Sequence, residues 1–279
     1  MTSHDVVNRI RRFTGESSVG HMGTLDPMAT GVLPLLLGKY TRLAQFFGSM
    51  DKTYTGTIRF GFATDTYDFE GAALSSPSEV SLSLDLVRES ASYFQGEMNQ
   101  TPPPFSAKKI AGKPAYKSAR EGKPVVLRPA RITILNFEIT AFSVDRAEFI
   151  ISVSSGGYVR SVAHELGERL GCGAHLASLR RIQAGPFMLK DALNFETMAN
   201  LPDAAALEEG LPHPRSILPA LPSIGADEVT AGRIRNGGAV NLPEFSDAPM
   251  VKIFSGQKIL LAIGKRVAGT LFQPVVVLG

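Results

Sequence analysis

Residues 19–34, VGHMGTLDPMATGVLP, surround one carboxylate, that of Asp26. The three glycines of this segment give its backbone access to positive φ, and Pro27 keeps the residue before it out of the helical region. His21 and Asp26 carry its titratable side chains. Two interpretations follow: Asp26 is the centre of an active-site loop, or it is a helix N-cap with Pro27 at the first helical position.

The composition is that of an ordinary globular chain. At 279 residues the length allows about two domains, and 44% hydrophobic residues can bury a sizeable core. No apolar run approaches the ~20 residues of a membrane span, and the first residues lack the pattern of a signal peptide. The single cysteine, Cys172, cannot form an internal disulfide, which is typical of a reducing compartment. We expect a cytoplasmic protein that does not use a membrane.

Positive charge is concentrated in one segment, although the formal net charge is only +3. Between residues 103 and 131 a single acid, Glu121, stands among basic residues and two aromatic ones, Phe105 and Tyr116. This pattern fits either a solvated basic face or a surface that follows a phosphate backbone. The basic residues are Lys108, Lys109, Lys113, Lys117, Arg120, Lys123, Arg128 and Arg131.

Hydrophobic periodicity predicts a chain of mixed helices and strands. Residues 52–62 alternate between apolar and polar side chains, as in a strand with Tyr54 on its buried face. Strands are also predicted at 132–144 and 147–153. Helical apolar stripes predict helices as well. One has Ser3 as its N-cap, another lies near Leu86, a third covers 159–170, and a further one is a short basic helix at 179–181.

The C-terminal part has a different character. Prolines punctuate the chain after Leu201, and we place a linker at about 213–222. Short apolar runs near 251–254, 258–263 and 271–278 predict a small all-β module.

The order Gly-His-x-Gly-Thr-Leu-Asp-Pro-x-Ala-Thr-Gly-x-Leu-Pro in residues 20–34 resembles the signature of the TruB family of tRNA pseudouridine synthases, whose catalytic residue is the aspartate. The resemblance extends from Met1 to about Arg181. It implies an α+β pseudouridine synthase fold with a mixed, largely antiparallel central sheet. The implied domains are a catalytic domain at 1–215, with a basic RNA-binding insert at about 100–131, and a PUA-like RNA-binding domain at 222–279.

Family members carry a strand and a Lys-Pro-x-Gly turn before the first helix, and Met1 stands where that turn would end. Either residues before Met1 belong to the natural protein, or an edge strand beside the site is missing.

Two further motifs resemble catalytic elements of the family. Lys52-Thr53-Tyr54 matches a Lys-x-Tyr motif whose tyrosine stacks on the target base. Gly157-Tyr158-Val159-Arg160 matches a Gly-x-Tyr-x-Arg motif whose arginine pairs with the catalytic aspartate and whose tyrosine lines the pocket. The resemblance thus implies Asp26, Tyr54 and Arg160 as catalytic residues, with Tyr158 and Leu179 as walls of the substrate pocket.

The remaining site residues are expected to bind RNA. Residues 64–71 resemble a family segment that borders the RNA, which makes Asp68 a candidate, although Asx-turn chemistry also explains this loop. Lys108 and Lys109 follow a proline-rich segment similar to the family's Pro-x-x-Ser-Ala-x-Lys. His21 is expected to support the space that the target uridine leaves when it flips out of its stack.

The resemblance implies the isomerisation of uridine to pseudouridine at position 55, in the T loop of tRNA. The N1–C1′ bond breaks, the base turns, and C5 bonds to the ribose. This isomerisation requires no cofactor, no metal and no second substrate, and one carboxylate suffices, unlike the pair of a glycosidase. The sequence leaves open attack at C1′, attack at C6, and elimination. We expect a monomer that binds the T stem-loop.

Two other functions would use parts of the same sequence. A tRNA-binding or tRNA-folding chaperone would use the same cleft without catalysis, but it has no need of an intact Asp26, Tyr54 and Arg160. A metal-dependent hydrolase would use Asp65, Asp68 and Glu70, but their order is not that of a calcium loop. Cys172, His164 and His175 also lack the spacing of a zinc site.

Overall fold

The computed structural model describes residues 1–106, 109–110, 113–114 and 127–279 of the chain. The described residues form two compact units. The first consists of Met1–Ser3, Gly23–Pro34 and Ser49–Ala192, and the second of His4–Met22, Leu35–Gly48 and Leu193–Gly279.

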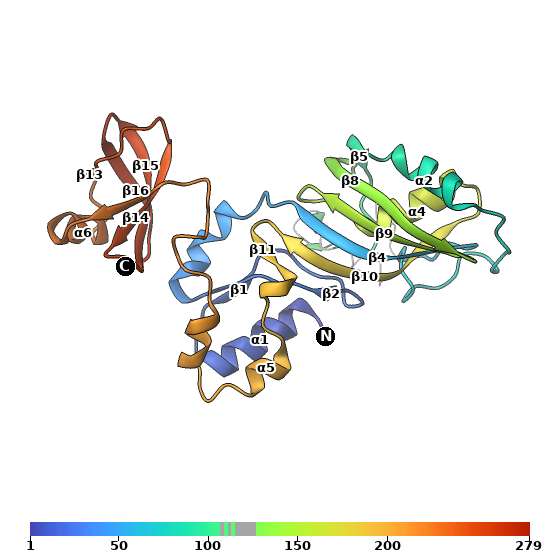
Figure 1. The fold of residues 1–279 in the computed structure, drawn as a ribbon, viewed down its shortest axis with the longest axis horizontal. Helices are drawn as coiled ribbons and strands as arrows, with labels where there is room; N and C mark the ends of the chain where they lie inside the picture. The colour runs from blue at the N-terminus through green and yellow to red at the C-terminus, as the bar shows by residue number, and fades with distance from the viewer. Residues whose placement is uncertain (107–108, 111–112, 115–126) are drawn as a thin grey trace. The chain divides into compact units, whose positions relative to one another are not determined.

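A seven-stranded sheet dominates the described part of the first unit (Figure 1). Its strands lie in the order β11-β10-β4-β9-β8-β5, and β2 pairs with β10 outside this path. The β2–β10 pair is parallel and the other pairs are antiparallel, which confirms the predicted mixed, largely antiparallel sheet. The strands are β2 (Thr30–Gly31), β4 (Lys52–Phe60), β5 (Gly96–Gln100), β8 (Ala130–Ser143), β9 (Arg146–Val153), β10 (Ala174–Ala184) and β11 (Phe187–Met188).

The alternation that predicted β4 is present in the structure. Tyr54, Ile58 and Phe60 are buried on one face, and their even-numbered spacings of four and two residues fit the two-residue period of a strand. The strand ends at Phe60 rather than at residue 62, because Gly61 turns the chain with a φ of 103°.

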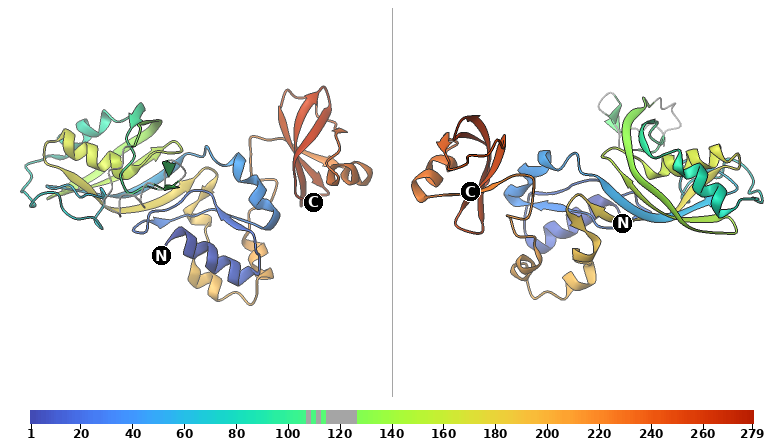
Figure 2. Two further views of the ribbon diagram at one scale, coloured as in Figure 1. Left: turned by 180° about the vertical axis from the view of Figure 1, so that it is seen from behind. Right: turned by 45° about the horizontal axis from the view of Figure 1, so that its top comes forward.

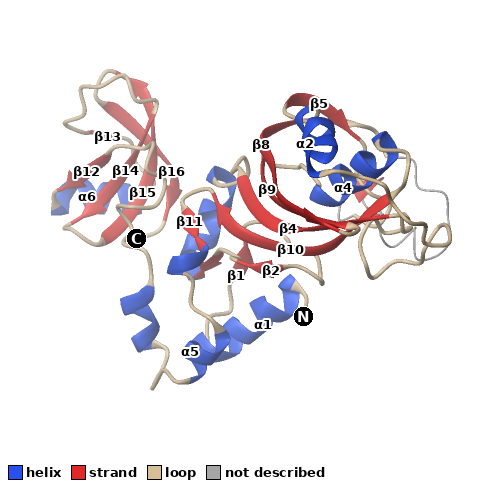
Figure 3. Cartoon of the chain, turned by 45° about the vertical axis from the view of Figure 1, so that its right-hand side comes forward, coloured by secondary structure: helices blue, strands red, loops and turns tan. Residues whose placement is uncertain are grey.

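Two helices cover the same face of this sheet (Figure 3). They are α2 (Leu84–Ser92) and α4 (Val159–Arg169), and both lie where the apolar periodicity predicted helices. Val87 of α2 and Leu166 of α4 are fully buried in one core with the sheet residues. The Ser83 hydroxyl accepts a hydrogen bond from the Leu86 N–H and caps α2.

The predicted short helix at 179–181 is wrong, because these residues belong to the central strand β10. Leu179 and Arg181 are buried and Arg180 between them is exposed, which is the period of a strand. Because the inward position 181 carries an arginine instead of an apolar residue, the sequence of β10 does not show the apolar–polar alternation of a strand. Pairing with β4 along one side of β10 decides the conformation despite the weak local signal.

The second unit contains a five-stranded sheet in the order β12-β14-β15-β16-β13 among its described residues, drawn in red shades in Figure 2. The predicted C-terminal strands are present, and a short helix α6 (Glu228–Arg235) connects two of the others. The strands are β12 (Ser223–Ala226), β13 (Val240–Asn241), β14 (Met250–Ser255), β15 (Ile259–Ala268) and β16 (Leu271–Val277).

The second unit also includes most of the first helix, α1 (Ser3–Thr14). Val7 and Ile10 of α1 form a small core with Val19 and Met198. Its other elements are β1 (Val19–His21), β3 (Leu35–Leu37), the 3₁₀ helices η1 (Gly38–Phe46) and η3 (Ala205–Gly210), and α5 (Phe195–Ala199). The two units divide the chain differently from the predicted boundary at 215–222, which stays a prediction.

The predicted N-cap role of Ser3 is wrong. Its side chain is buried. The hydroxyl accepts a hydrogen bond from the Leu25 N–H at 2.9 Å and donates one to the Leu25 carbonyl oxygen at 3.2 Å. Ser3 therefore bonds to the backbone immediately before Asp26 instead of capping its own helix.

Three short elements complete the first unit: β6 (Lys109–Ile110), β7 (Lys113–Pro114) and η2 (Leu189–Asp191). Across the ranges described, no helix combines the length and the apolar character that crossing a bilayer requires.

Candidate active site

Asp26 lies in a turn rather than at the start of a helix. Its carbonyl oxygen accepts a hydrogen bond from the Ala29 N–H at 2.9 Å, and Pro27 and Met28 occupy the corner. The alternative in which Asp26 caps a helix is therefore wrong. The carboxylate is free for another partner, and its side chain keeps 31% of its surface exposed.

That partner is Arg160, the second residue of α4. Arg160 Nε donates to Asp26 Oδ2 at 2.8 Å, and Arg160 Nη2 donates to Asp26 Oδ1 at 3.0 Å. The two parallel bonds form a bidentate pair, which fixes both the position and the plane of the carboxylate. Arg160 is almost completely buried, so the pair presents the carboxylate rather than the guanidinium to solvent.

The rest of the Arg160 guanidinium is held from behind. Nη1 donates to the Thr66 carbonyl oxygen and Nη2 to the Phe105 carbonyl oxygen, both at 3.0 Å. Asp68 Oδ2 lies 3.5 Å from Nη1. Because a buried cation is costly without partners, these contacts stabilise Arg160 in the orientation that meets Asp26.

Asp68 is buried, and the polar contacts of its carboxylate lie within its own loop and on Arg160. Its Oδ1 accepts hydrogen bonds from the Thr66 hydroxyl at 2.6 Å and from the Glu70 N–H at 3.1 Å. Asp65 Oδ1 likewise accepts from the Ala72 N–H at 2.8 Å. Two of the three carboxylates proposed as metal ligands thus bond to their own loop, and among the described residues no cluster of His, Cys, Asp or Glu is grouped to hold a metal ion.

Tyr54 lies on the buried face of β4, with 8% of its surface exposed. Burial raises the pKa of its hydroxyl, whereas the charge of Arg181 lowers it. The charge of Asp26 also raises this pKa, so the hydroxyl lies within electrostatic reach of the carboxylate. The structure therefore brings Asp26, Tyr54 and Arg160 together from three different parts of the sequence.

Tyr158 and Leu179 lie on elements that adjoin this group. The backbone of Tyr158, just before α4, exchanges two hydrogen bonds with the side chain of buried Gln100. Burial raises the pKa of the Tyr158 hydroxyl, while Ser106 and Arg160 lower it and Asp26 raises it further. Leu179 is buried in the core against which Leu25 packs.

The other predicted site residues either belong to the second unit or are not fully covered by the described residues. His21 belongs to the second unit, where it pairs with Leu35 across β1 and β3. Lys108 and much of the basic insert lie outside the described residues. Lys109 is in β6, and its side chain is not described.

Sequence inspection missed Gln100 and Arg181. Both are polar side chains that the fold buries, at 1% and 0% exposure. The signal for Arg181 was its position two residues after the apolar Leu179, which places both on the same side of a strand. This signal is informative only once the segment is known to be a strand.

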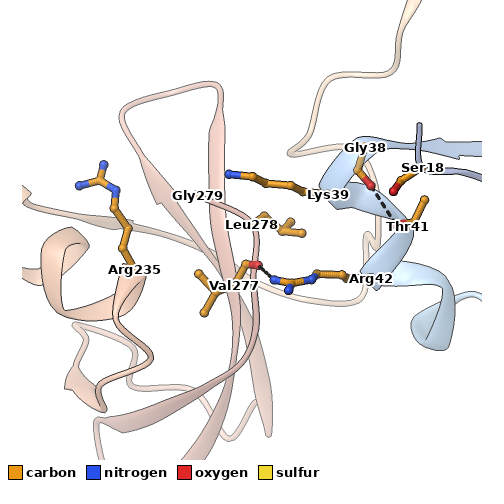
Figure 4. A pocket seen from close by; sticks show the side chains of 9 residues that line it. All are labelled: Ser18, Gly38, Lys39, Thr41, Arg42, Arg235, Val277, Leu278 and Gly279. Carbon is orange, nitrogen blue, oxygen red and sulfur yellow. Dashed lines mark hydrogen bonds between the residues drawn. The ribbon is translucent and has the colours of Figure 1, made fainter. Parts of the chain in front are cut away.

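A separate cavity of about 420 Å³ belongs to the second unit (Figure 4). None of the predicted catalytic residues lines it. Arg42 Nη1 closes part of its wall by donating to the Val277 carbonyl oxygen at 2.7 Å. Its lining residues are Ser18, Gly38, Lys39, Thr41, Arg42, Arg235, Val277, Leu278 and Gly279.

Comparison with known proteins gives the family. Residues 11–159 match the model of the TruB family pseudouridylate synthase N-terminal domain. The chain belongs to the TruB family. Residues 160–220 match the C-terminal domain of tRNA pseudouridylate synthase B. Family membership confirms the expectation of a pseudouridine synthase, an isomerase, over that of a non-catalytic chaperone.

Individual TruB relatives align over nearly the whole chain. The tRNA pseudouridine synthase B of Solibacter usitatus is 41% identical and covers 99% of this chain and 96% of its own. That of Aquifex aeolicus is 38% identical and covers 97% and 93%.

Solved structures support the fold. The archaeal box H/ACA sRNP Nop10-Cbf5 complex contains a chain with a TM-score of 0.70 at 22% identity, covering 100% of this chain and 83% of its own. A chain of an H/ACA RNP bound to a substrate RNA containing 2′-deoxyuridine has a TM-score of 0.65 at 20% identity, covering 100% and 82%. At these identities the TruB-type fold is what the likeness establishes.

Proposed function

We propose that this chain converts uridine to pseudouridine at position 55 in the T loop of tRNA, with Asp26 as the residue that acts on the ribose. The observation that supports this most is the bidentate Asp26–Arg160 pair, in which the buried cation orients a partly exposed carboxylate. A protein that only bound RNA would gain nothing from such a carboxylate, because it repels phosphate.

The isomerisation needs groups that this chain supplies itself. Asp26 acts as nucleophile or as the base that removes a sugar proton, and Arg160 holds it oriented. Tyr54 stacks on the uracil and exchanges the C5 proton. The reaction needs no redox change, because the N1–C1′ bond is exchanged for a C5–C1′ bond within one nucleotide.

The target base must leave its stack before its glycosidic bond can be reached. In this proposal Tyr158 and Leu179 wall the pocket that receives the base, and His21 supports the space it leaves. Asp68 acts from behind through Arg160. Lys108 and Lys109, in the insert at about 100–131, contact the stem through its phosphates.

We further propose that residues 1–215 are the catalytic domain and that residues 222–279 are a PUA-like domain that contacts the same tRNA. The enzyme acts as a monomer in the cytoplasm.

The test is tritium release from a T-loop RNA labelled at C5 of uridine, in the presence of a chelator. Wild type is expected to release tritium, and Asp26→Asn to release none while binding RNA at least as tightly. The matched control is Asp191→Asn, which neutralises an exposed carboxylate in η2 and is expected to release tritium like wild type. Full turnover by Asp26→Asn would overturn the catalytic assignment, and RNA binding without release by wild type would favour the chaperone.

A further inference from the structure

Arg181 is the largest fully buried side chain among the described residues, with 0% of its surface exposed. It lies on β10 beside β4, and its neighbour Arg180 points outward to solvent. A buried guanidinium costs several kcal/mol unless its donors find partners, whereas leucine or methionine would fill such a site cheaply. The partners of Arg181 therefore indicate its purpose.

The side-chain hydrogen bonds of Arg181 go to backbone carbonyls at opposite ends of the Asp26 loop, residues 23–32, while the third nitrogen, Nη1, has no hydrogen-bond partner among the described residues. Arg181 Nη2 donates to the Gly23 carbonyl oxygen at 3.0 Å, before Asp26. Arg181 Nε donates to the Val32 carbonyl oxygen at 2.8 Å, after it. One side chain thus binds both ends of the loop that carries the carboxylate.

The backbone of Arg181 holds the same loop. Its carbonyl oxygen accepts a hydrogen bond from the Val32 N–H at 2.9 Å, and Arg181 pairs with Gly31 in the parallel β2–β10 ladder. Strands β2 and β10 approach so closely that a Cβ at Gly31 would lie 2.1 Å from the Arg181 carbonyl oxygen. The end of the loop is therefore fixed to β10 by contacts that leave no room for a side chain.

Tyr54 lies beside Arg181 on the adjacent strand. Tyr54 and Arg181 are paired positions in the β4–β10 register. Burial raises the pKa of the Tyr54 hydroxyl, and the charge of Arg181 lowers it. A guanidinium presents several N–H donors in one rigid plane, so it can hold two carbonyls at fixed relative positions and keep its charge beside the hydroxyl, which the point charge of a lysine cannot.

We propose that Arg181 is a positioning residue that fixes the Asp26 loop against β10, beside Tyr54 on the adjacent strand. This inference rests on the proposed roles of Asp26 and Tyr54. Because Arg181 is fully buried, it acts through these groups rather than on the RNA. It sets the rate of the chemical step and leaves the affinity for RNA unchanged.

The experiment measures single-turnover tritium release at saturating enzyme, separately from the Kd for the same RNA. Arg181→Met is expected to slow release about 100-fold, the scale of a misplacement of about 1 Å, with a Kd within about threefold of wild type. Arg181→Lys is expected to recover part of this loss because it restores one donor. The control is Arg180→Met, which removes the exposed neighbouring charge and is expected to keep the wild-type rate at saturation.

A double-mutant cycle separates positioning from plain structural support. Tyr54→Phe removes the hydroxyl whose pKa the Arg181 charge lowers, so adding Arg181→Lys, which displaces that charge, is expected to cost less than Arg181→Lys costs alone. All rates are taken well below each variant's melting temperature, and Arg181→Lys, which keeps a buried cation, supplies the result if Arg181→Met does not fold.

A wild-type rate for the Arg181 variants would overturn the positioning role, as would full additivity with Tyr54→Phe or a loss confined to Kd. Failure of the proposed function looks different. In that case wild type itself releases no tritium, or Asp26→Asn retains full release.

Discussion

Arg160 and Asp26 are joined by two parallel hydrogen bonds, of 2.8 Å and 3.0 Å, across 134 residues of sequence. The arginine is buried and the aspartate is partly exposed, so the pair has a buried side and a side that faces solvent. The arrangement depends on the planar, two-pronged shape of the guanidinium.

Arg160→Lys is therefore expected to lower single-turnover tritium release about 100-fold, because an ammonium cannot form both bonds and the carboxylate loses its fixed plane. The matched control is Arg59→Lys. Arg59 pairs with Asp145 at 2.8 Å, but the Arg59 side chain is 36% exposed whereas that of Arg160 is 5% exposed, and the pair lies outside the site. Equal rates for the two variants would contradict the role assigned to Arg160.

Gly31→Ala is expected to destabilise the protein by about 3 kcal/mol or more, because the residue has a φ of 107° and its Cβ would lie 2.1 Å from the Arg181 carbonyl oxygen. The added Cβ is fixed to the backbone of β2 and the oxygen belongs to the backbone of β10, and these paired strands cannot move apart cheaply. The control is Gly20→Ala, in the same motif, where a Cβ meets nothing within 4 Å. Thermal unfolding measures both, and a similar Tm for the two variants would refute the close approach.

Lys252→Met is expected to loosen the segment that precedes the C-terminal sheet. Lys252 is buried, and its Nζ donates to the carbonyl oxygens of Arg215 at 2.6 Å and Ile217 at 2.8 Å. Its removal leaves two carbonyls without a donor, at a cost of about 1–3 kcal/mol.

Limited proteolysis between residues 213 and 222 is expected to accelerate in Lys252→Met. The exposed lysine of the neighbouring strand gives the control, Lys265→Met, which is expected to be cleaved like wild type. Unchanged cleavage of Lys252→Met would mean that the segment is held by other contacts.

Stability is expected to fall as the pH drops below about 6.5, in part because of His175. Burial lowers the pKa of this histidine below its ordinary value of 6.5, and its Nδ1 lies 3.1 Å from the Phe62 carbonyl oxygen. The unfolded chain then binds more protons than the folded one below pH 6.5, so the free energy of unfolding decreases on acidification.

The measurement is Tm between about pH 7.5 and about pH 5.5, compared with His175→Gln. The variant is expected to lose less Tm over this range than wild type. Burial also lowers the pKa of His164, so the variant retains part of the slope. His4→Gln, at an exposed position, is the control, and a slope in His175→Gln equal to that of wild type would contradict the prediction.

The sequence by itself determined the elements whose signals are local. Strict alternation around Tyr54 predicted β4, and apolar stripes predicted α2 and α4, because each pattern follows directly from the periodicity of its own backbone. Motifs around Asp26, Tyr54 and Arg160 indicated the family and nominated the three residues that the fold brings together. Those motifs contain their key residues at fixed spacing, so no tertiary information was needed to find them.

Only the tertiary structure decided which polar residues are buried and what they bind. Arg181 was predicted to lie in a short basic helix, yet it is a fully buried residue of strand β10, because pairing with β4 outweighs a weak local preference. Ser3 was predicted to cap a helix, but its hydroxyl bonds to the backbone of Leu25. A helix cap was also one interpretation of Asp26, but its carboxylate bonds to Arg160. In each case the partner lies at least 22 residues away, and hydrogen bonds over such separations leave no periodic trace in the sequence.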